Sequence, residues 1–292
     1  MEIDEPFVTE WGNVLFPPFH TSCRCAVEYE EIENAVSRTE FADNTQQQRD
    51  FEEEGEKFRE IQDKLSDIAG KVGNDLKSFA SGEKLTSYDE LPENITKPFE
   101  EGLKNADTNV KTLLEKEMKK VSYAIDKERI AYNRKWDYIK IKEDVSPSAM
   151  AHELFHRIDY KYGIIEKYDF KKTLQKDFDD ILKKCVRDGS VEGYLLRKYS
   201  YMFEKRTKKG WEVFEKYRGI SDMFSGLTID KLNLGYGHKR EYWLKDKMKL
   251  SKEAWSQYGS IFYRNDGEVT KVFKELFPSF YESAIMVTKE LI

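Results

Sequence analysis

The segment HELFH at residues 152–156 constrains this chain more than any other feature. The chain has only 4 His in 292 residues, so two of them four positions apart are improbable by chance. Residues i and i+4 lie on one face of a helix, where both imidazoles can reach a single ion at about 2 Å. Glu153 lies one step around that helix, close enough to take a proton from a water on the ion. The motif predicts a zinc (Zn²⁺)-dependent hydrolase that acts on peptides.

The residues on either side of the motif predict a helix. Ser146 is a good N-cap, and Pro147 fits the first helical position. Gly163 offers a stop signal, and the intervening residues contain neither Gly nor Pro. Leu154 and Ile158 are i,i+4 neighbours that can face a core. The alternative interpretation is a surface helix that carries two histidines by accident.

The segment 136–142 (WDYIKIK) largely alternates apolar and polar residues. This alternation predicts a half-buried strand that ends just before Asp144. Many zinc peptidases place an edge strand antiparallel to the substrate, which then joins the sheet by main-chain hydrogen bonds. An ordinary edge strand that covers the helix would have the same pattern, and the sequence leaves both interpretations open.

A hydrolytic zinc ion needs three protein ligands and one open position. Only His20 and His238 remain among the histidines, so a carboxylate is a candidate for the third ligand. Glu253 stands in an apolar-striped helix that Ser251 could cap. A glutamate in the first turn of a helix is also favoured by the helix dipole, without any metal. The spacing by itself leaves both roles open for Glu253.

The order of these segments resembles the gluzincin metallopeptidases, and the layout is similar to the catalytic domain of anthrax lethal factor. Asp159 keeps the aspartate that follows the second histidine by three residues in that family, and residues 253–258 (EAWSQY) resemble its Glu-Ala-aromatic helix. The resemblance covers roughly residues 126–292. It implies that His152, His156 and Glu253 bind zinc. Gln257 stands where the family has a second glutamate, so a charge is missing there.

The resemblance also implies a tyrosine, ahead of the third ligand, that donates a hydrogen bond to the oxyanion. Tyr236 keeps the family's Tyr-Gly pair and is preferred, while Tyr242 lies closer in sequence to Glu253. His238 is expected to assist as a contact to substrate or transition state. In this scheme Glu153 accepts a proton from the attacking water and returns it to the leaving amine.

A second resemblance lies near the N-terminus. Residues 16–25 (FPPFHTSCRC) resemble the closing signature of Mu-type phage head morphogenesis proteins, the minor head proteins near the portal. The resemblance implies phage head or portal proteins as partners. Only the end of such a domain precedes residue 26. The spacing of His20, Cys23 and Cys25 would suit either a second metal or a local structural role.

Composition excludes several other classes of function. A net charge of −6 and a pI of about 5.6 argue against a broad nucleic-acid surface. Three cysteines cannot form a disulfide framework, which suits a reducing compartment or a virion. The sequence shows neither an apolar run of about 18 residues nor a secretory signal peptide, so we expect no membrane partner.

These patterns predict a mainly α fold with a small antiparallel or mixed β-sheet (α+β), in the manner of the zincins. We expect the tail of a minor head protein over 1–38, a linker over 39–50, a charged helical region over 51–125 and a zincin-like domain over 126–292. Further helices are predicted over 104–120, 168–186, 194–208 and 279–292.

Two kinds of function fit this sequence. In the first, a phage minor head protein carries a zinc peptidase, a toxin or effector that cleaves a peptide or protein substrate in the bacterial host cytoplasm. In the second, the domain is a non-catalytic module of the phage head or portal, and any zinc only stabilises it. Processing of the head proteins themselves would be a third use of the same chemistry. A base at Glu153, beside the ligands, favours the enzyme because a structural site has no use for one.

Overall fold

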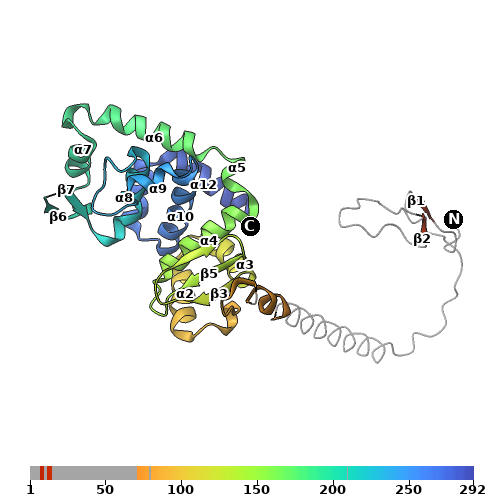
Figure 1. Cartoon of the computed structure of the whole chain (residues 1–292). Helices are drawn as coiled ribbons and strands as arrows, with labels where there is room; N and C mark the ends of the chain where they lie inside the picture. The colour runs from red at the N-terminus through yellow and green to blue at the C-terminus, as the bar shows by residue number, and fades with distance from the viewer. Residues whose placement is uncertain (1–6, 10–11, 15–70, 79, 209) are drawn as a thin grey trace, which may run out of the picture. The chain divides into compact units, whose positions relative to one another are not determined.

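A computed structural model of the chain describes residues 7–9, 12–14, 71–78, 80–208 and 210–292. The chain divides into two units, Met1–Ile61 and Gln62–Ile292 (Figure 1). In the first unit, β1 (Phe7–Thr9) pairs antiparallel with β2 (Gly12–Val14). The head-protein signature with His20, Cys23 and Cys25, the linker and residues 51–70 lie outside the described residues.

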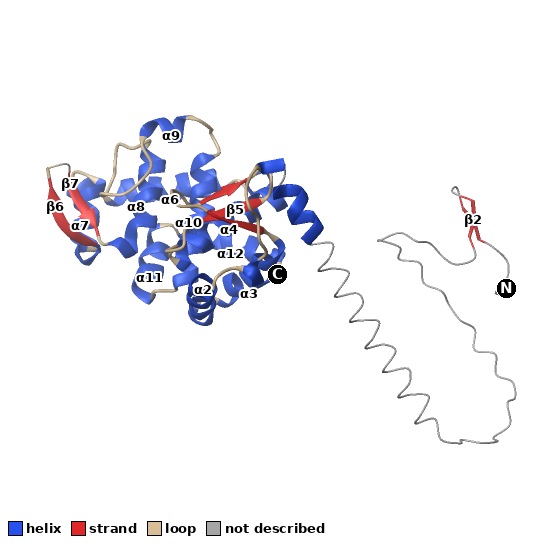
Figure 2. Cartoon of the chain, turned by 60° about the horizontal axis from the view of Figure 1, so that its bottom comes forward, coloured by secondary structure: helices blue, strands red, loops and turns tan. Residues whose placement is uncertain are grey.

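The second unit is mainly helical and carries two small sheets, which confirms the predicted α+β class (Figure 2). None of the described helices is both long and apolar enough to cross a membrane. Residues 71–78 and 80–81 are helical. The α-helices that follow are α2 (Glu93–Asn105), α3 (Thr108–Glu117), α4 (Pro147–Tyr162), α5 (Ile164–Lys167), α6 (Phe170–Lys184), α7 (Val191–Lys198), α8 (Arg218–Thr228), α9 (Arg240–Leu244), α10 (Lys249–Arg264), α11 (Gly267–Leu276) and α12 (Pro278–Leu291). Short 3₁₀ helices include η2 (Met118–Lys120) and η5 (Glu215–Tyr217).

The mixed sheet has the strand order β3-β5-β4. β5 (Tyr138–Ile141) runs parallel to β3 (Ser122–Ile125) and antiparallel to β4 (Ala131–Asn133). The strand predicted over 136–142 is therefore present, but its predicted edge position is wrong. Three of the four β5 residues are buried, as in a strand with neighbours on both sides, and β4 forms the edge instead. β3 lies before residue 126, where the sequence analysis places the start of the zincin-like domain, yet it belongs to the same sheet as β4 and β5.

α4 begins and ends where the sequence predicts. The Ser146 hydroxyl oxygen accepts a hydrogen bond from the amide of Ala149 at 3.3 Å, and Pro147 is the first helical residue. Gly163 ends the helix at a φ of 62°, in the left-handed region that glycine adopts at low cost. Leu154 and Ile158 are fully buried, so the core-facing side of α4 is confirmed.

α4 packs directly on α10, and this contact builds the site (Figure 1). Trp255 Nε1 donates to the carbonyl oxygen of Phe155 at 3.0 Å. A Cβ at Gly259 would lie 2.2 Å from the Phe155 ring, so only glycine allows the helices to approach this closely. α10 begins at Lys249, before the predicted cap Ser251, which places Glu253 in the second turn instead of the first.

Other helix predictions are confirmed in part. The ends of α6 and α12 lie no more than two residues from the ends of the helices predicted over 168–186 and 279–292. The helix predicted over 104–120 is broken, because the Asp107 side chain caps the new helix α3. The helix predicted over 194–208 is wrong beyond Lys198. β6 (Phe203–Thr207) follows and forms a hairpin with β7 (Gly210–Val213), where Gly210 has a φ of 125°.

A buried ionic network fixes the position of α4. Arg157 donates from Nη1 to Glu117 Oε2 and from Nε to Asp137 Oδ1, both at 2.9 Å. Glu117 also accepts a hydrogen bond from the Tyr162 hydroxyl at 2.7 Å. Asp137 lies in the turn between β4 and β5 and accepts a hydrogen bond from the Tyr132 hydroxyl at 3.1 Å. The network therefore connects α3, the β4–β5 turn and the histidine-bearing helix.

We expect this network to make stability depend on acid pH. Burial alone would raise the pKa of the Glu117 carboxyl, but hydrogen bonds from surrounding side chains outweigh it and lower the pKa to about 2. These donors are Tyr162, Lys120, Lys161 and Arg157. Because the folded pKa lies below the ordinary value of 4.5, the charged carboxylate favours the folded state. About 3 kcal/mol of stability, present above that value, should be lost as the pH falls towards 2.

Urea unfolding at a series of pH values between 6 and 2 measures this loss. Glu117→Gln is the matched control, because it keeps the shape of the side chain and removes its titration. The difference in unfolding free energy between the two proteins should shrink as the pH falls. A difference that stays constant over the whole range would contradict the assignment.

Candidate metal centre

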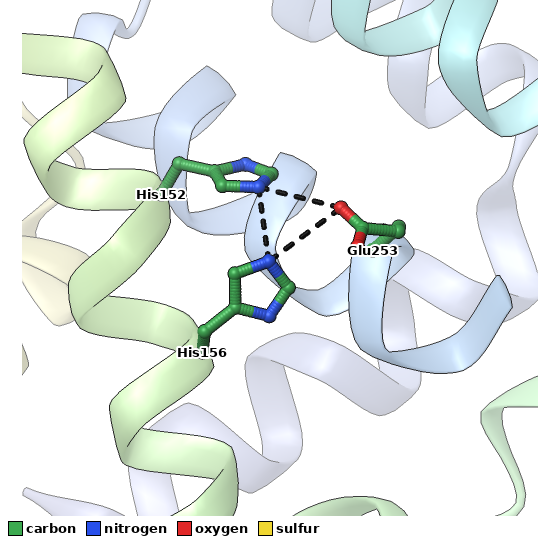
Figure 3. Close-up of side chains that lie close together, drawn as sticks. All are labelled: His152, His156 and Glu253. Carbon is green, nitrogen blue, oxygen red and sulfur yellow. Dashed lines mark hydrogen bonds and ion pairs between the residues drawn. The ribbon is translucent and has the colours of Figure 1, made fainter. Parts of the chain in front are cut away.

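Three side chains from two helices converge on one point (Figure 3). His152 and His156 come from successive turns of α4, and Glu253 comes from α10. The Nε2 atoms of the two histidines lie 3.1 Å apart. Glu253 Oε2 lies 3.4 Å from His152 Nε2 and 3.5 Å from His156 Nε2. The structure thus brings together the three residues predicted as ligands.

The spacing of these three atoms suits a zinc ion. Atoms bound about 2.05 Å from one tetrahedral ion lie about 3.3 Å apart, close to the separations found here. Two imidazoles and one carboxylate also form a donor set that zinc uses in catalytic sites, where a fourth position stays open. The Glu253 carboxylate is only 3% exposed, and a buried carboxylate needs a nearby positive charge.

The electrostatics of the cluster agree with a cation site. Burial would lower the pKa of His156, but the negative charge of Glu253 outweighs burial and raises the pKa to about 9. Burial would raise the pKa of Glu253, whereas His156 and His152 hold it well below its usual range. The pocket therefore keeps Glu253 ionised and attracts positive charge to the point between the three groups.

Glu153 lies beside the ligands and is held by the sheet. Its Oε2 accepts a hydrogen bond from the backbone amide of Tyr132 at 2.7 Å. Tyr132 belongs to β4, whose other edge pairs with β5, so this amide points outwards from the sheet towards α4. One carboxylate oxygen is thus fixed while the side chain lines the same cleft as the histidines. This is a suitable position for a general base.

The two tyrosines predicted as oxyanion donors lie in different places. The Tyr242 hydroxyl donates to Glu253 Oε1, and Lys249 Nζ lies 3.3 Å from the Tyr242 oxygen. Burial and the charge of Glu253 raise the pKa of Tyr242, so the hydroxyl stays protonated. Tyr236 lines the cleft wall with 45% exposure, and its hydroxyl makes no hydrogen bond to the described residues. Tyr242 therefore orients Glu253, the predicted third ligand, and the Tyr236 hydroxyl in the cleft is free of hydrogen bonds to the described residues.

We expect Tyr242→Phe to weaken zinc binding by about 10–100-fold, the range typical when a hydrogen-bond partner of a metal ligand is lost. Glu253 would lose the donor that orients its carboxylate. Competition with a chromophoric chelator measures the affinity. Tyr236→Phe is the matched control and should leave the zinc affinity unchanged. Equal affinities in all three proteins would show that Tyr242 does not position the ligand.

Asp222 is a site residue that the sequence analysis missed. It is fully buried in α8, and its Oδ1 lies 2.9 Å from His238 Nδ1. Gln257 Nε2 donates to the other Asp222 oxygen at 3.2 Å, so this glutamine serves Asp222. Burial lowers the pKa of His238, but the hydrogen bond and charge of Asp222 outweigh it and raise the pKa. No sequence motif marks Asp222, which is separated from His238 by 16 positions.

His238 lies next to the proposed ligands. Its ring stacks on Tyr242 with centroids 3.8 Å apart, and ligand atoms of Asp222, His238 and Glu253 all lie within 4.8 Å of one another. Asp222 Oδ1 also accepts a hydrogen bond from the backbone amide of His238 at 2.9 Å. This double contact orients the imidazole ring through Nδ1 and leaves Nε2 as the ring nitrogen that Asp222 does not occupy.

Asp159 makes no hydrogen bond to His152 or His156, which are both among the described residues. Its carboxylate is buried, and Oδ1 accepts a hydrogen bond from the amide of Ile165 at 2.8 Å. Burial raises the pKa of Asp159. The aspartate that carries the family resemblance thus connects the end of α4 to α5 in this structure.

Apart from the fully buried Asp222, these groups line one cleft of about 910 Å³. Its walls come from the edge strand β4, from α4 and α10, and from the segment 215–242 that includes the start of α8. No family model matches the chain, and searches of curated proteins and of solved structures likewise found no match.

Proposed function

We propose that the unit Gln62–Ile292 is a zinc-dependent peptidase of the gluzincin type, with a zincin-like fold. The observation that carries this proposal is the convergence of His152, His156 and Glu253 at separations of 3.1–3.5 Å. Glu153 beside them supplies a base, and the open cleft supplies room for a substrate. A purely structural metal site would need neither the base nor the cleft.

The three ligands would hold zinc at the floor of the cleft. When bound, zinc polarises a carbonyl group as a Lewis acid and makes water a nucleophile near neutral pH. Glu153 takes the proton of the attacking water and later delivers it to the leaving amine. The hydrogen bond from the Tyr132 amide keeps this carboxylate in place during both transfers.

Two further groups serve the reacting carbonyl oxygen. Asp222 orients His238 and raises its pKa, and His238 would donate to the charge that develops on that oxygen. The free hydroxyl of Tyr236 is the remaining donor on the same wall of the cleft. In this assignment Tyr242 acts through Glu253 and is a positioning residue.

The edge strand β4 offers a main-chain contact to the substrate. β4 pairs with β5 on one side only, and residues 130–132 line the cleft on the other. A peptide in extended conformation can lie antiparallel to β4 and continue the sheet across the cleft. The proposed substrate is therefore an unfolded or extended segment of a protein.

The test is hydrolysis of an unfolded protein such as denatured casein by the zinc-loaded chain, with Glu153→Gln beside it. Fragments released by the parent protein alone would support the peptidase. Zinc bound at one equivalent without any cleavage would favour the non-catalytic module of a phage head. The proposed association with phage head or portal proteins rests on residues 16–25, which lie outside the described residues.

A further inference from the structure

The cleft continues past the metal centre along one face of α10. Glu253, Gln257, Ser260 and Arg264 follow one another at steps of four, three and four residues, and all four line the cleft. Arg218, at the start of α8, lines the same end of the cleft. This end therefore carries two guanidinium groups beyond the proposed zinc site.

Arg264 forms no ion pair with any of the described residues. Its Nη2 donates to the carbonyl oxygen of Lys216 at 2.8 Å, which anchors the side chain to η5. Its Nε is buried and has no hydrogen-bond partner among the described residues. Burial lowers the pKa of Arg264, and Asp266 and Glu215 offset this only in part. A partly buried cation whose hydrogen bonds are incomplete is stabilised by an incoming carboxylate.

Arg218 is the more accessible of the two cations. Its side chain is 50% exposed and lies 3.6 Å from Glu215, whose side chain is 82% exposed and therefore strongly screened by solvent. The guanidinium lies over the Tyr236 ring, 5.4 Å from its centroid. A Cβ on the next residue, Gly219, would lie 2.6 Å from Gln257 Oε1, so α8 contacts α10 closely here. This contact holds Arg218 at the wall of the cleft.

The direction in which a substrate would lie follows from the orientations of β4, α4 and α10. A peptide antiparallel to β4 runs from the Arg134 end of that strand towards Ile130. Arg134 lies 4.4 Å over the ring of Tyr160, near the C-terminal end of α4. α10 runs antiparallel to α4, since Phe155 contacts Gly259 while Asp159, later on α4, lies within electrostatic range of Lys252, earlier on α10. The C-terminal side of the substrate therefore enters the end of the cleft that holds Arg218 and Arg264.

We infer that Arg218 and Arg264 form a subsite for a carboxylate on the C-terminal side of the scissile bond. The carboxylate comes from an Asp or Glu side chain or from the free C-terminus of the substrate. Arg264 follows Glu253 by 11 residues, about 16 Å along the helix, and helical side chains lean back towards the N-terminus. At about 3.3 Å per residue, the subsite reaches the first four or so substrate positions. This inference deepens the proposed peptidase function and rests on it.

Cleavage of a peptide pool tests the inference. The zinc-loaded parent acts on a pool of random decapeptides, made once with free and once with amidated C-termini, and mass spectrometry identifies the new termini. Asp and Glu should be enriched about tenfold over Asn and Gln within four positions after the cut, the effect of one charged hydrogen bond. Cleavage within four residues of the C-terminus in the free-acid pool, and not in the amidated pool, would assign the carboxylate to the chain terminus.

Variants separate the subsite from general charge effects. Arg218→Gln and Arg264→Gln should each reduce the enrichment, and Arg218 is exposed enough for its variant to fold normally. Arg134→Gln removes a cation from the opposite end of the same cleft and should leave the enrichment unchanged. Cleavage with neither acidic enrichment nor a dependence on the free C-terminus, or an equal preference in all four proteins, would overturn the inference and leave the peptidase intact.

A binding measurement separates this inference from the proposed function. The same pools are passed over immobilised Glu153→Gln protein, and the retained peptides are sequenced. Retention of acidic peptides, reduced in the Arg218→Gln form of that protein, would support the subsite even if the parent cleaved nothing. Retention that neither enriches acidic residues nor differs between the free-acid and amidated pools would overturn the subsite whatever the cleavage result.

Discussion

Glu153→Gln should lower the rate of peptide hydrolysis by about 10³-fold, within the range attributed to general acid–base catalysis. Glutamine has the same shape, and its amide oxygen can still accept the hydrogen bond from Tyr132. It cannot take up or deliver a proton at neutral pH. The loss should therefore appear in kcat and leave the fold and the metal content unchanged. Hydrolysis of a fluorogenic peptide chosen from the cleaved pool measures the rate.

Two controls make the Glu153 result specific. Zinc content by elemental analysis should be one equivalent in both the parent and the variant. Glu166→Gln removes another carboxylate from the same cleft without touching the proposed ligands, and should retain most of the activity. A Glu153→Gln protein that cleaves as fast as the parent would show that the base lies elsewhere.

Glu253→Ala should weaken zinc binding by more than about 100-fold, because the loss of a ligand exceeds the loss of a ligand's hydrogen-bond partner. The parent protein should gain thermal stability as zinc is added, since an ion that binds only the folded state raises the melting temperature by mass action. The variant should show almost no gain at the same zinc concentrations. Thermal unfolding followed by circular dichroism measures both responses.

The metal-free proteins provide a necessary comparison for Glu253. Its carboxylate is buried beside two histidines, so its removal also changes the charge balance of the empty cluster. The zinc-induced shift of each protein, measured against its own metal-free form, removes this effect. Glu241→Ala, an exposed glutamate on α9, is the matched control. A Glu253→Ala protein with the parental zinc-induced shift would exclude Glu253 as a ligand.

The sequence predicts the local parts of this site well. The cap, the first proline and the terminal glycine of α4 depend on neighbours within one turn of chain, and the histidine spacing depends on helix geometry alone. The prediction of Glu253 as a ligand depended on the family resemblance, because the helix dipole favours a glutamate near the start of a helix with or without a metal. The structure brings Glu253 to within 3.5 Å of both histidines.

Contacts between residues that are distant in the sequence could not be predicted from local sequence patterns. Asp222 contacts His238 and Gln257 across two helices, and neither spacing follows a helical or strand period. β4 is only three residues long and half-buried, too short for an alternating pattern to mark it as the edge strand. The hairpin after α7 depends on pairing between Phe203 and Val213, which single-segment propensity does not reveal.

During synthesis of the chain, the proposed ligands on α4 and the proposed ligand on α10 leave the ribosome at different times. His152, Glu153 and His156 emerge about a hundred residues ahead of Glu253 on α10, a delay of roughly 5–20 s at the usual rates of translation. A nascent chain that ends between α4 and α10 holds the proposed base but only two of the three proposed ligands. If the chain is a peptidase, it would be unable to cut neighbouring nascent proteins, or itself, until most of its domain had left the ribosome.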